Sequence, residues 1–483
     1  MTINKIAMGN KFSYIRIVNY FYFNIVKEDK MLFMRSVVAV LLTATFGIRA
    51  FASEGMNIST QMLDNGLEII VVENHTVPLV TIEICVKNGA YTESPEYDGL
   101  SHLYEHMFFK ANEVIPSQPV FLERLRELGA SWNGSTSEER VNYFFTMGVD
   151  SLEQGLVFMR DAIMYPVFEQ KELENERPVV TGEYDRAESQ PFFHLNQSVG
   201  KKLWYKYWSR KNVIGDREVI LTATTEKMLI VKNKYYIPNN SALLVSGDVT
   251  MEEVLPLIQK IFAKWERGEQ PHDKYPIPEH PSLTKNEKVI VEKPFQVVGY
   301  QVAYHGPSVK LDPKATYAAD VFSFILGQSN SKFMKALHES GLWLNIGLGY
   351  YTLSYTGPIT ITGTTTPQKF KEAQESLFEE IAKFNEPDYF TDEQMEFAKN
   401  QLEVLEIYSR EQASTWVHTV SFWWAVTGGM DYYQNYVSDL RTVSREDISK
   451  YVTDYILDKY HVTGVLIASE SREEIGLKEE DLK

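Results

Sequence analysis

The chain has 483 residues, 44% of them hydrophobic and 13% aromatic, which excludes a wholly disordered chain and predicts two to four domains at roughly 100–200 residues each. Its 65 Asp and Glu outnumber its 48 Lys and Arg, and the net charge of −17 argues against a general nucleic-acid-binding protein. The single cysteine, Cys85, excludes an intrachain disulfide framework and a four-cysteine zinc site, and its strand-like surroundings indicate a buried apolar residue.

The N-terminal segment has the pattern of a targeting signal. Residues 31–52 contain a short basic start at Met34-Arg35, a mostly apolar run from Ser36 to Ile48, and the A-x-A pattern Ala50-Phe51-Ala52. The run is too short to span a bilayer comfortably, so we predict a secretory signal peptide cleaved after this pattern, with a membrane anchor as the alternative. The protein is then exported to the periplasm or the exterior. We interpret residues 1–30 as an upstream extension, with initiation at Met31 or Met34.

Strand-like and helix-like runs alternate over residues 56–265. The predicted strands cover residues 67–72, 80–86, 140–149 and 240–249, where β-branched residues are frequent. A helix is predicted from Gly99 to Lys110, with Asp98 as its N-cap. Thr250 and Glu253 have the spacing of a capping box and predict the start of another helix.

The same order of elements follows a polar segment with four prolines, residues 266–287, which we interpret as a linker. Beyond it we predict strands over 297–304 and 357–366, a largely helical stretch over 313–340, and capping boxes at Thr391-x-x-Gln394 and Ser444-x-x-Asp447. The domain boundaries that follow are an extension and signal peptide at 1–52, a first domain at 53–265, the linker at 266–287 and a second domain at 288–483. Similar lengths and element order suggest a duplicated α+β unit.

The motif with the clearest chemistry is His102-Leu-Tyr-Glu105-His106, an H-x-x-E-H pentapeptide. On a helix, residues four apart share one face, so both imidazoles can bind one ion. Glu105 lies beside the same face and can take a proton from a metal-bound water. Two surface histidines on an amphipathic helix are the alternative interpretation.

A third ligand has to come from elsewhere in the chain. Residues 171–186 form a helix-like run rich in acidic side chains. Glu176 and Glu183 are seven residues apart, two helical turns, and therefore share a face. Most charge runs are solvated faces, but two carboxylates on one face can serve as a ligand and as a group that orients a ligand.

These features together resemble the inverzincin zinc metallopeptidases of the pitrilysin/insulinase type, most closely the bacterial branch that is similar to the mitochondrial processing peptidase. The family pattern is H-x-x-E-H, then 76 residues, then a glutamate; residues 107–182 fill that interval and Glu183 follows. Further matches are 63–67, 99–101, 109–110, 235–240 and 247–248. The resemblance covers the chain from the end of the predicted signal peptide, strongly in the first half and weakly in the second.

The resemblance implies one Zn²⁺ per chain held by His102, His106 and Glu183, with Glu105 as the base and Glu176 orienting the ligands. It also implies a fold of two homologous α/β-sandwich domains in a clam-like arrangement, each an antiparallel-rich sheet packed by helices, with the zinc in the first domain only.

Residues 129–136 resemble the edge strand to which the substrate adds in this family, although Asn-Ala is more usual there than Asn133-Gly134. The resemblance implies that Asn133, Gly134 and Ser135 bind the peptide as an added strand. A turn formed by Asn133-Gly134 is the alternative interpretation.

The second half departs from the family pattern at one point. Single-chain members supply an Arg and a Tyr there, which bind the peptide carbonyl and stabilise the developing oxyanion. This chain has His338 and Leu344 at those positions, and neither replaces a guanidinium fork or a phenol. The resemblance therefore suggests a homodimer or a heterodimer with a paralogous subunit that supplies the Arg/Tyr pair; substitution by Tyr350 or Tyr351 is the weaker alternative.

The sequence thus predicts an exported zinc metalloendopeptidase that acts on peptides and does not bind nucleic acid. A scaffold or peptide-binding subunit of the same fold, without catalytic activity, is the competing hypothesis, because fold does not fix function.

Overall fold

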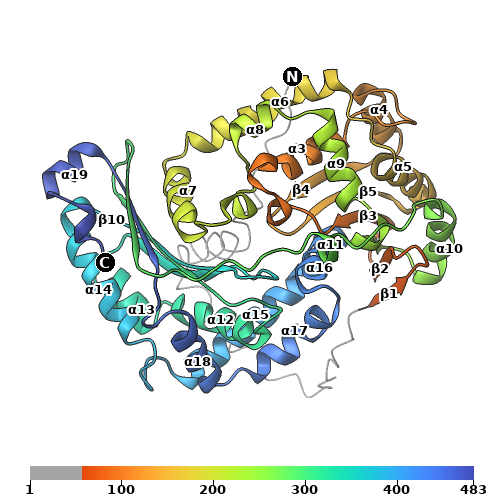
Figure 1. The fold of residues 1–483 in the computed structure, drawn as a ribbon. Helices are drawn as coiled ribbons and strands as arrows, with labels where there is room; N and C mark the ends of the chain where they lie inside the picture. Colours follow the sequence, from red (N-terminus) through yellow and green to blue (C-terminus); the bar gives the residue numbers. More distant parts are fainter. Residues whose placement is uncertain (1–56) are drawn as a thin grey trace, which may run out of the picture. The chain divides into compact units, whose positions relative to one another are not determined.

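A computed structural model of the protein describes residues 57–483 (Figure 1). The predicted signal peptide and extension, residues 1–52, lie outside the described residues. Within residues 57–483, no helix combines the length and the apolar character that crossing a membrane requires.

The first half contains a six-stranded sheet. Its strands are β1 (Ile58–Met62), β2 (Glu68–Glu73), β3 (Leu79–Val86), β4 (Ser131–Thr136), β5 (Val141–Gly148) and β6 (Ser241–Gly247). Its helices are α3 (Leu100–Phe108), α4 (Gln118–Glu127), α5 (Leu152–Met164), α6 (Gln170–Glu188), α7 (Pro191–Leu203), α8 (Arg217–Leu221), α9 (Thr225–Tyr235), α10 (Met251–Phe262) and α11 (Pro271–Lys274).

The second half contains a five-stranded sheet. Its strands are β7 (Glu287–Glu292), β8 (Val298–His305), β9 (Asn345–Tyr350), β10 (Pro358–Thr365) and β11 (Val462–Ile467). Its helices are α12 (Pro313–Leu326), α13 (Lys332–Met334), α14 (Phe370–Ala382), α15 (Asp392–Ser409), α16 (Ala413–Thr427), α17 (Asp431–Thr442), α18 (Arg445–Tyr455) and α19 (Ser469–Ile475). The stretch predicted as helical over 313–340 is broken after α12 and ends in a π-helical turn at Lys335–Glu339.

The two sheets share one topology. The first has the order β1-β2-β6-β3-β5-β4 and the second β7-β11-β8-β10-β9. Apart from β1, which adds antiparallel to β2, the five strands of each sheet correspond in order. In both sheets the last strand of the half pairs in parallel with one neighbour, β6 with β2 and β11 with β7, and the remaining pairs are antiparallel. The predicted α+β fold with two homologous antiparallel-rich units is therefore confirmed.

The central strands β2, β6 and β3 of the first sheet are buried on both faces, which explains their nearly continuous apolar sequence. Ile69 and Val71 of β2 join the core that contains residues of α3, α5 and α10. Ile70 and Val72 point to the other face and pack, with Cys85 of β3, against α16 of the second half. Figure 1 shows α16 beside β2 and β3.

The second sheet is packed in the reciprocal way. One face carries a core with residues of α12, α14 and α18. On the other face, Leu195 and Val199 of α7 pack against Ala303, Val462 and Leu466. Each sheet is therefore covered on one face by a helix from the other half, so the two halves are joined through α7 and α16 as well as through the chain connection at 266–286.

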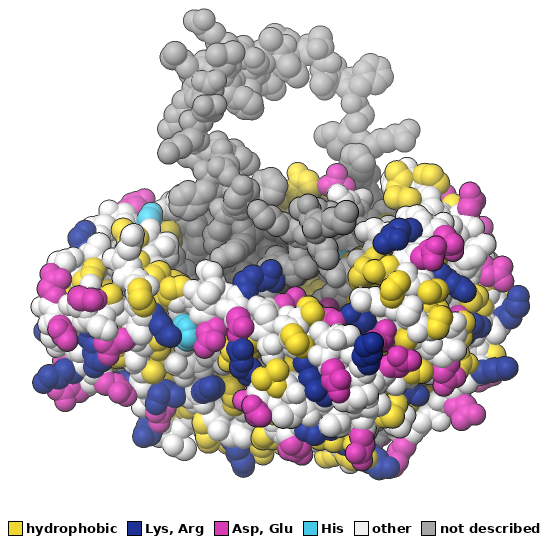
Figure 2. All heavy atoms as spheres, turned by 90° about the horizontal axis from the view of Figure 1, so that it is seen from above, with side chains coloured by type: hydrophobic (Ala, Val, Ile, Leu, Met, Phe, Trp, Pro, Cys, Tyr) yellow, Lys and Arg dark blue, Asp and Glu magenta, His cyan; other side chains and the backbone are white. Residues whose placement is uncertain are grey.

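On the face shown in Figure 2, Lys and Arg side chains are interspersed with Asp and Glu side chains. Charges of mixed sign distributed in this way favour solubility without a strong field of one sign.

Candidate metal centre

The helix α3 is fixed at its start by a carboxylate from outside the helix. Glu93 accepts hydrogen bonds from the backbone N–H of Gly99, 2.7 Å, and of Ser101, 2.6 Å. The prediction of Asp98 as N-cap is wrong, because Gly99 occupies that position with φ 96° and the Asp98 carboxylate accepts instead from Asn212, 3.1 Å. Burial raises the pKa of Glu93 to about 8, and the hydrogen bonds from Gly99 and Ser101 counteract this rise.

Amphipathic spacing decides which side chains of α3 face the site. Leu100, Leu103, Tyr104 and Met107 are buried in the core, so the remaining face carries the two histidines and Glu105. His102 and His106 lie one turn apart, with ring centroids 5.0 Å apart and the ring planes at 82°. The prediction of a helix over the pentapeptide is confirmed.

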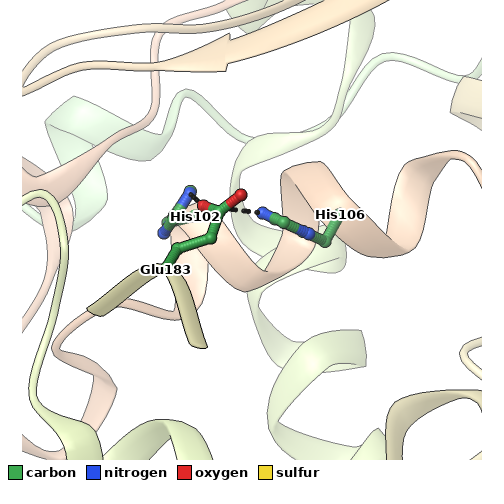
Figure 3. Close-up of side chains that lie close together, drawn as sticks. All are labelled: His102, His106 and Glu183. Carbon is green, nitrogen blue, oxygen red and sulfur yellow. Dashed lines mark ion pairs between the residues drawn. The ribbon is translucent and has the colours of Figure 1, made fainter. Parts of the chain in front are cut away.

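Glu183 comes from α6, the 19-residue helix that carries the acidic run (Figure 3). Its Oε2 lies 3.6 Å from Nε2 of His102 and 3.6 Å from Nε2 of His106. One ligand atom from each of the three residues lies within 4.8 Å of the others. Within residues 57–483, this is the one group of three or more His, Cys, Asp or Glu side chains with metal-like spacing.

The geometry of these three residues fits a zinc ion. Ligand atoms at about 2.1 Å from a tetrahedral ion lie about 3.4 Å from one another, close to the two distances of 3.6 Å. Two imidazoles and one carboxylate form a donor set that zinc uses in hydrolytic sites and that leaves a fourth position for water. The side chains are partly shielded, with 16%, 16% and 29% exposure for His102, His106 and Glu183.

The local charge favours a cation at this place. Burial lowers the pKa of His106, but hydrogen bonds to Glu176 and Glu183 and the charge of Glu105 outweigh burial and raise this pKa to about 10. Burial raises the pKa of Glu183, but the two histidines outweigh it and hold the pKa below its ordinary value. The carboxylates that favour a positive charge on the imidazole also favour a metal cation, which binds the ring nitrogen in place of the proton.

Glu176 contacts the back of the His106 ring. Its Oε1 lies 2.9 Å from Nδ1 of His106, while its Oε2 lies 2.5 Å from Nζ of Lys110. A carboxylate that accepts from Nδ1 leaves Nε2, the atom beside Glu183, with a lone pair for a metal. The structure thus places Glu176 next to His106, where the resemblance implies an orienting group.

Glu105 lies between α3 and the edge strand β4. The hydroxyl of Thr136 donates to its Oε2 at 2.7 Å. A β-carbon added to Gly134 would lie 2.9 Å from Cγ of Glu105 and 3.2 Å from a ring carbon of Phe109, so the strand approaches the side chain as closely as glycine permits.

Asn133, Gly134 and Ser135 belong to β4, which forms the outer edge of the first sheet. The alternative of a turn at Asn133-Gly134 is therefore wrong. Side chains alternate along a strand: Gly134 and Thr136 face Glu105, whereas the Ser135 hydroxyl donates to Oδ1 of Asn142 at 2.5 Å. Asn133 is exposed.

The two positions that depart from the family pattern lie in the second half. His338 belongs to the π-helical turn, and its Nδ1 lies 3.3 Å from the carbonyl oxygen of Trp343. Leu344 is half exposed and has no polar atom on its side chain. The Tyr350 hydroxyl donates to the carbonyl of Pro307 at 3.0 Å, which gives it a structural contact.

Two residues at the site had no role assigned from the sequence, Lys110 and Thr136. Lys110 is four residues beyond His106, and Thr136 is two residues beyond Gly134 on the same strand face. These spacings indicate only which face each residue shares with a site residue; the contacts of Lys110 and Thr136 join separate elements and depend on the fold.

Two family models match the chain. Residues 68–215, which include the metal-centre residues, match the insulinase model of peptidase family M16. Residues 222–402 match the model described as the peptidase M16 inactive domain.

Individual relatives and solved structures agree with these models. A zinc protease of Rickettsia felis is 24% identical over 352 residues, covering 72% of this chain and 82% of the relative. A sequence assigned as subunit beta of the mitochondrial-processing peptidase in Arabidopsis thaliana is 24% identical over 273 residues, covering 56% of this chain and 50% of that one. A Helicobacter pylori protease structure has a TM-score of 0.76 at 20% identity, covering 86% of this chain and all of the other. The periplasmic protease PqqL of Escherichia coli has a TM-score of 0.73 at 16% identity, covering 88% of this chain and 49% of the other.

Proposed function

Because this chain belongs to the insulinase family of peptidases, family M16, we propose that it is a zinc-dependent endopeptidase with its metal centre at His102, His106 and Glu183. The observation that carries the proposal is the approach of both imidazole Nε2 atoms to one Glu183 oxygen at 3.6 Å. One Zn²⁺ per chain fits this set.

A zinc ion held there would polarise the peptide carbonyl and lower the pKa of a water molecule in its open position. The protein side chains transfer the protons and orient the reacting groups. Glu105 takes a proton from the attacking water and passes it to the leaving amine. Thr136 orients the Glu105 carboxylate by donating to its Oε2 at 2.7 Å. Glu176 keeps the His106 ring in position through the 2.9 Å contact with Nδ1.

The substrate is proposed to be an extended peptide that adds to β4. An edge strand offers unpaired N–H and C=O groups to an incoming strand, which supplies affinity through the main chain. Because Gly134 has no side chain, the backbone of β4 lies beside Glu105, and a peptide paired with it reaches the metal centre. In this proposal Asn133, Gly134 and Ser135 bind substrate mainly through their backbone, since the Ser135 hydroxyl is engaged by Asn142.

The oxyanion stabilisers are proposed to come from a second subunit. His338 and Leu344 stand where an Arg and a Tyr are expected, and a relative carries the name of a subunit of a processing peptidase. A heterodimer with a paralogous chain would supply the missing donors, whereas a second copy of this chain would again carry His338 and Leu344. Export to the periplasm or the exterior is proposed from residues 31–52, and the periplasmic location of a protease with a similar fold is consistent with it.

The test is the Glu105→Gln variant, assayed for zinc content and for cleavage of unstructured peptides. We expect zinc to be retained and cleavage to fall at least 100-fold, because amide nitrogen cannot accept the proton. Glu188→Gln removes a charge at an exposed position at the end of α6 and serves as the matched control. Cleavage by Glu105→Gln at the parent rate would reject the mechanism.

A non-catalytic scaffold or peptide-binding subunit is the second candidate, and the side chains at 338 and 344 favour it. The match to a model described as inactive covers residues 222–402, outside the metal centre, and therefore does not argue against zinc chemistry at 102–183. Zinc binding without cleavage, both alone and after addition of a paralogous subunit, would support this candidate. Cleavage by the purified chain alone would instead contradict the need for a second subunit.

A further inference from the structure

Lys110 is a buried lysine behind the metal centre. It lies two residues beyond the end of α3, and its backbone N–H donates to the carbonyl of Met107 at 3.2 Å. The residue is 8% exposed, and its Nζ lies 2.5 Å from Oε2 of Glu176. Lysine is among the residues least often buried without a partner, so its burial requires this ion pair.

The two oxygens of Glu176 are divided between two partners. Oε2 contacts Lys110, and Oε1 lies 2.9 Å from Nδ1 of His106. Lys110, Glu176 and His106 therefore form a chain of side-chain contacts, the Lys110–Glu176–His106 line, which ends at the imidazole that faces the metal site. The Glu176 side chain is 9% exposed. Glu183 lies on the other side of the ring, 3.6 Å from Nε2 of His106.

A buried carboxylate is costly unless a cation and hydrogen bonds compensate it. Lys110 is the cation in contact with Oε2 of Glu176. Without the ammonium group, the Glu176 side chain would lose this partner and turn toward water. His106 would then lose the acceptor that fixes its tautomer and ring orientation.

We propose that Lys110 is a positioning residue for the metal centre, holding Glu176 in the place where it orients His106 for the metal. This inference rests on the proposed zinc site, and it assigns Lys110 a role that acts through Glu176 and not through direct contact with the ion.

A simpler role for Lys110 is to fasten the segment after α3 to α6. Glu172, one turn before Glu176, already makes a contact of that kind, because its Oε2 accepts from the backbone N–H of Ala111 at 3.0 Å. Glu172→Ala therefore loosens the same segment without touching the Lys110–Glu176–His106 line, and it is the matched structural control.

The experiment measures the zinc dissociation constant of the full chain by competition with a chromophoric chelator. For Lys110→Met, which keeps the length of the side chain but removes the charge, we expect zinc affinity to fall roughly 10- to 100-fold, as for other groups that orient metal ligands. Lys110→Arg keeps the charge and should restore affinity to within about threefold of the parent. Glu172→Ala should also stay within about threefold.

A second measurement shows whether Lys110 acts through Glu176. In a Glu176→Gln background, Lys110→Met should weaken zinc binding by less than about threefold, because the acceptor of the ammonium has already lost its charge. Thermal unfolding without zinc, with Lys399→Met as a control for loss of another buried lysine, identifies variants that fail to fold.

The outcomes are distinct. If the parent chain binds no zinc, the proposed function fails. If the parent binds zinc and Lys110→Met binds zinc equally or more tightly, the positioning role is overturned. Tighter binding is the result expected if Lys110 only repels the nearby zinc ion, because its removal would then relieve the repulsion. Equal losses for Lys110→Met in the parent and in the Glu176→Gln background would also overturn it.

Discussion

Gly134→Ala tests how closely the edge strand approaches the catalytic base. The added β-carbon would lie 2.9 Å from Cγ of Glu105, 3.2 Å from Cε2 of Phe109 and 3.3 Å from the carbonyl oxygen of Asn142. Carbon atoms in contact are normally about 3.5–4.0 Å apart. The carbonyl belongs to the backbone of β5, which is paired on both sides, and the phenylalanine is buried in the core, so the Glu105 side chain is the group most able to move.

The size of the effect follows from these distances. Cγ of Glu105 has to move by about 0.6–1.1 Å to reach an ordinary contact distance. Overpacking of this kind costs about 1–3 kcal/mol, partly offset by the roughly 0.4–1 kcal/mol that Gly→Ala contributes by restricting the unfolded chain. Displacing a reacting group by about 1 Å can lower turnover by a factor on the order of 100. We therefore expect kcat to fall roughly 10- to 100-fold with modest destabilisation.

The assay combines peptide cleavage, zinc content and thermal unfolding. Zinc content should be unchanged, because His102, His106 and Glu183 are not among the groups that the new β-carbon meets. Gly148→Ala, at the end of the neighbouring strand, is the control: its β-carbon meets no atom within 4 Å and its φ of −62° suits alanine. Parent-level turnover by Gly134→Ala would refute the close approach of the strand to Glu105.

Thr136→Val removes the hydroxyl that lies 2.7 Å from Glu105 and preserves the shape of the side chain. This variant should lower kcat several-fold while its zinc content stays constant. An unchanged kcat would show that Thr136 does not orient the base. His418→Ala should destabilise the protein at pH 7, because the buried Glu83 carboxylate loses its imidazole partner and keeps only the hydrogen bond from Asn142 and the nearby charge of Arg140. Loss of a partner costs about 3–5 kcal/mol when it leaves a buried charge uncompensated, so the expected cost here is below that range. Burial raises the pKa of Glu83, but His418 and Arg140 outweigh burial and lower it below 4.5. The free energy of unfolding of the parent should therefore decrease as the pH falls below about 4.5, and that of His418→Ala should decrease less. Urea unfolding between pH 3.5 and pH 7 measures how the free energy of unfolding of each protein depends on pH. Burial raises the pKa of the Cys85 thiol to about 12, so an alkylating reagent at pH 8 should label this thiol only after unfolding. Mass spectrometry detects the label, and rapid labelling of the native protein would contradict the burial of Cys85.

The features that the sequence predicted well depend on residues close together in the chain. The capping boxes at Thr250, Thr391 and Ser444 are all formed, because each needs only two side chains three residues apart. The six strands predicted from β-branched residues and alternation correspond to β2, β3, β5, β6, β8 and β10 within two residues, because these are local signals. The same signals did not indicate β1, β7, β9 and β11.

Asp98 shows where local reasoning fails. An Asp immediately before an apolar helix is a good N-cap candidate, but the fold supplies Glu93 to the same backbone N–H groups and pairs Asp98 with Asn212, more than 100 residues away in sequence. The order of strands in the sheets and the packing of α16 on the first sheet are likewise set by contacts between distant segments.

The candidate metal centre was predicted in two different ways. Helical spacing alone places His102 and His106 on one face. Glu183 was chosen because its distance along the chain resembles a family pattern. In the structure its Oε2 lies 3.6 Å from Nε2 of each histidine. No spacing rule predicts the contacts of Lys110 and Thr136, because each joins elements that meet only in the folded protein.

The central claim is that two imidazoles of one helix and a carboxylate of another hold a single zinc ion. The most direct measurement is the metal content of the purified chain, determined by mass spectrometry for the parent and for Glu183→Ala after dialysis against zinc-free buffer. We expect one zinc ion per chain in the parent and little in the variant, with both proteins folded by circular dichroism. A folded parent without zinc, or a variant that retains the full complement, would contradict the account.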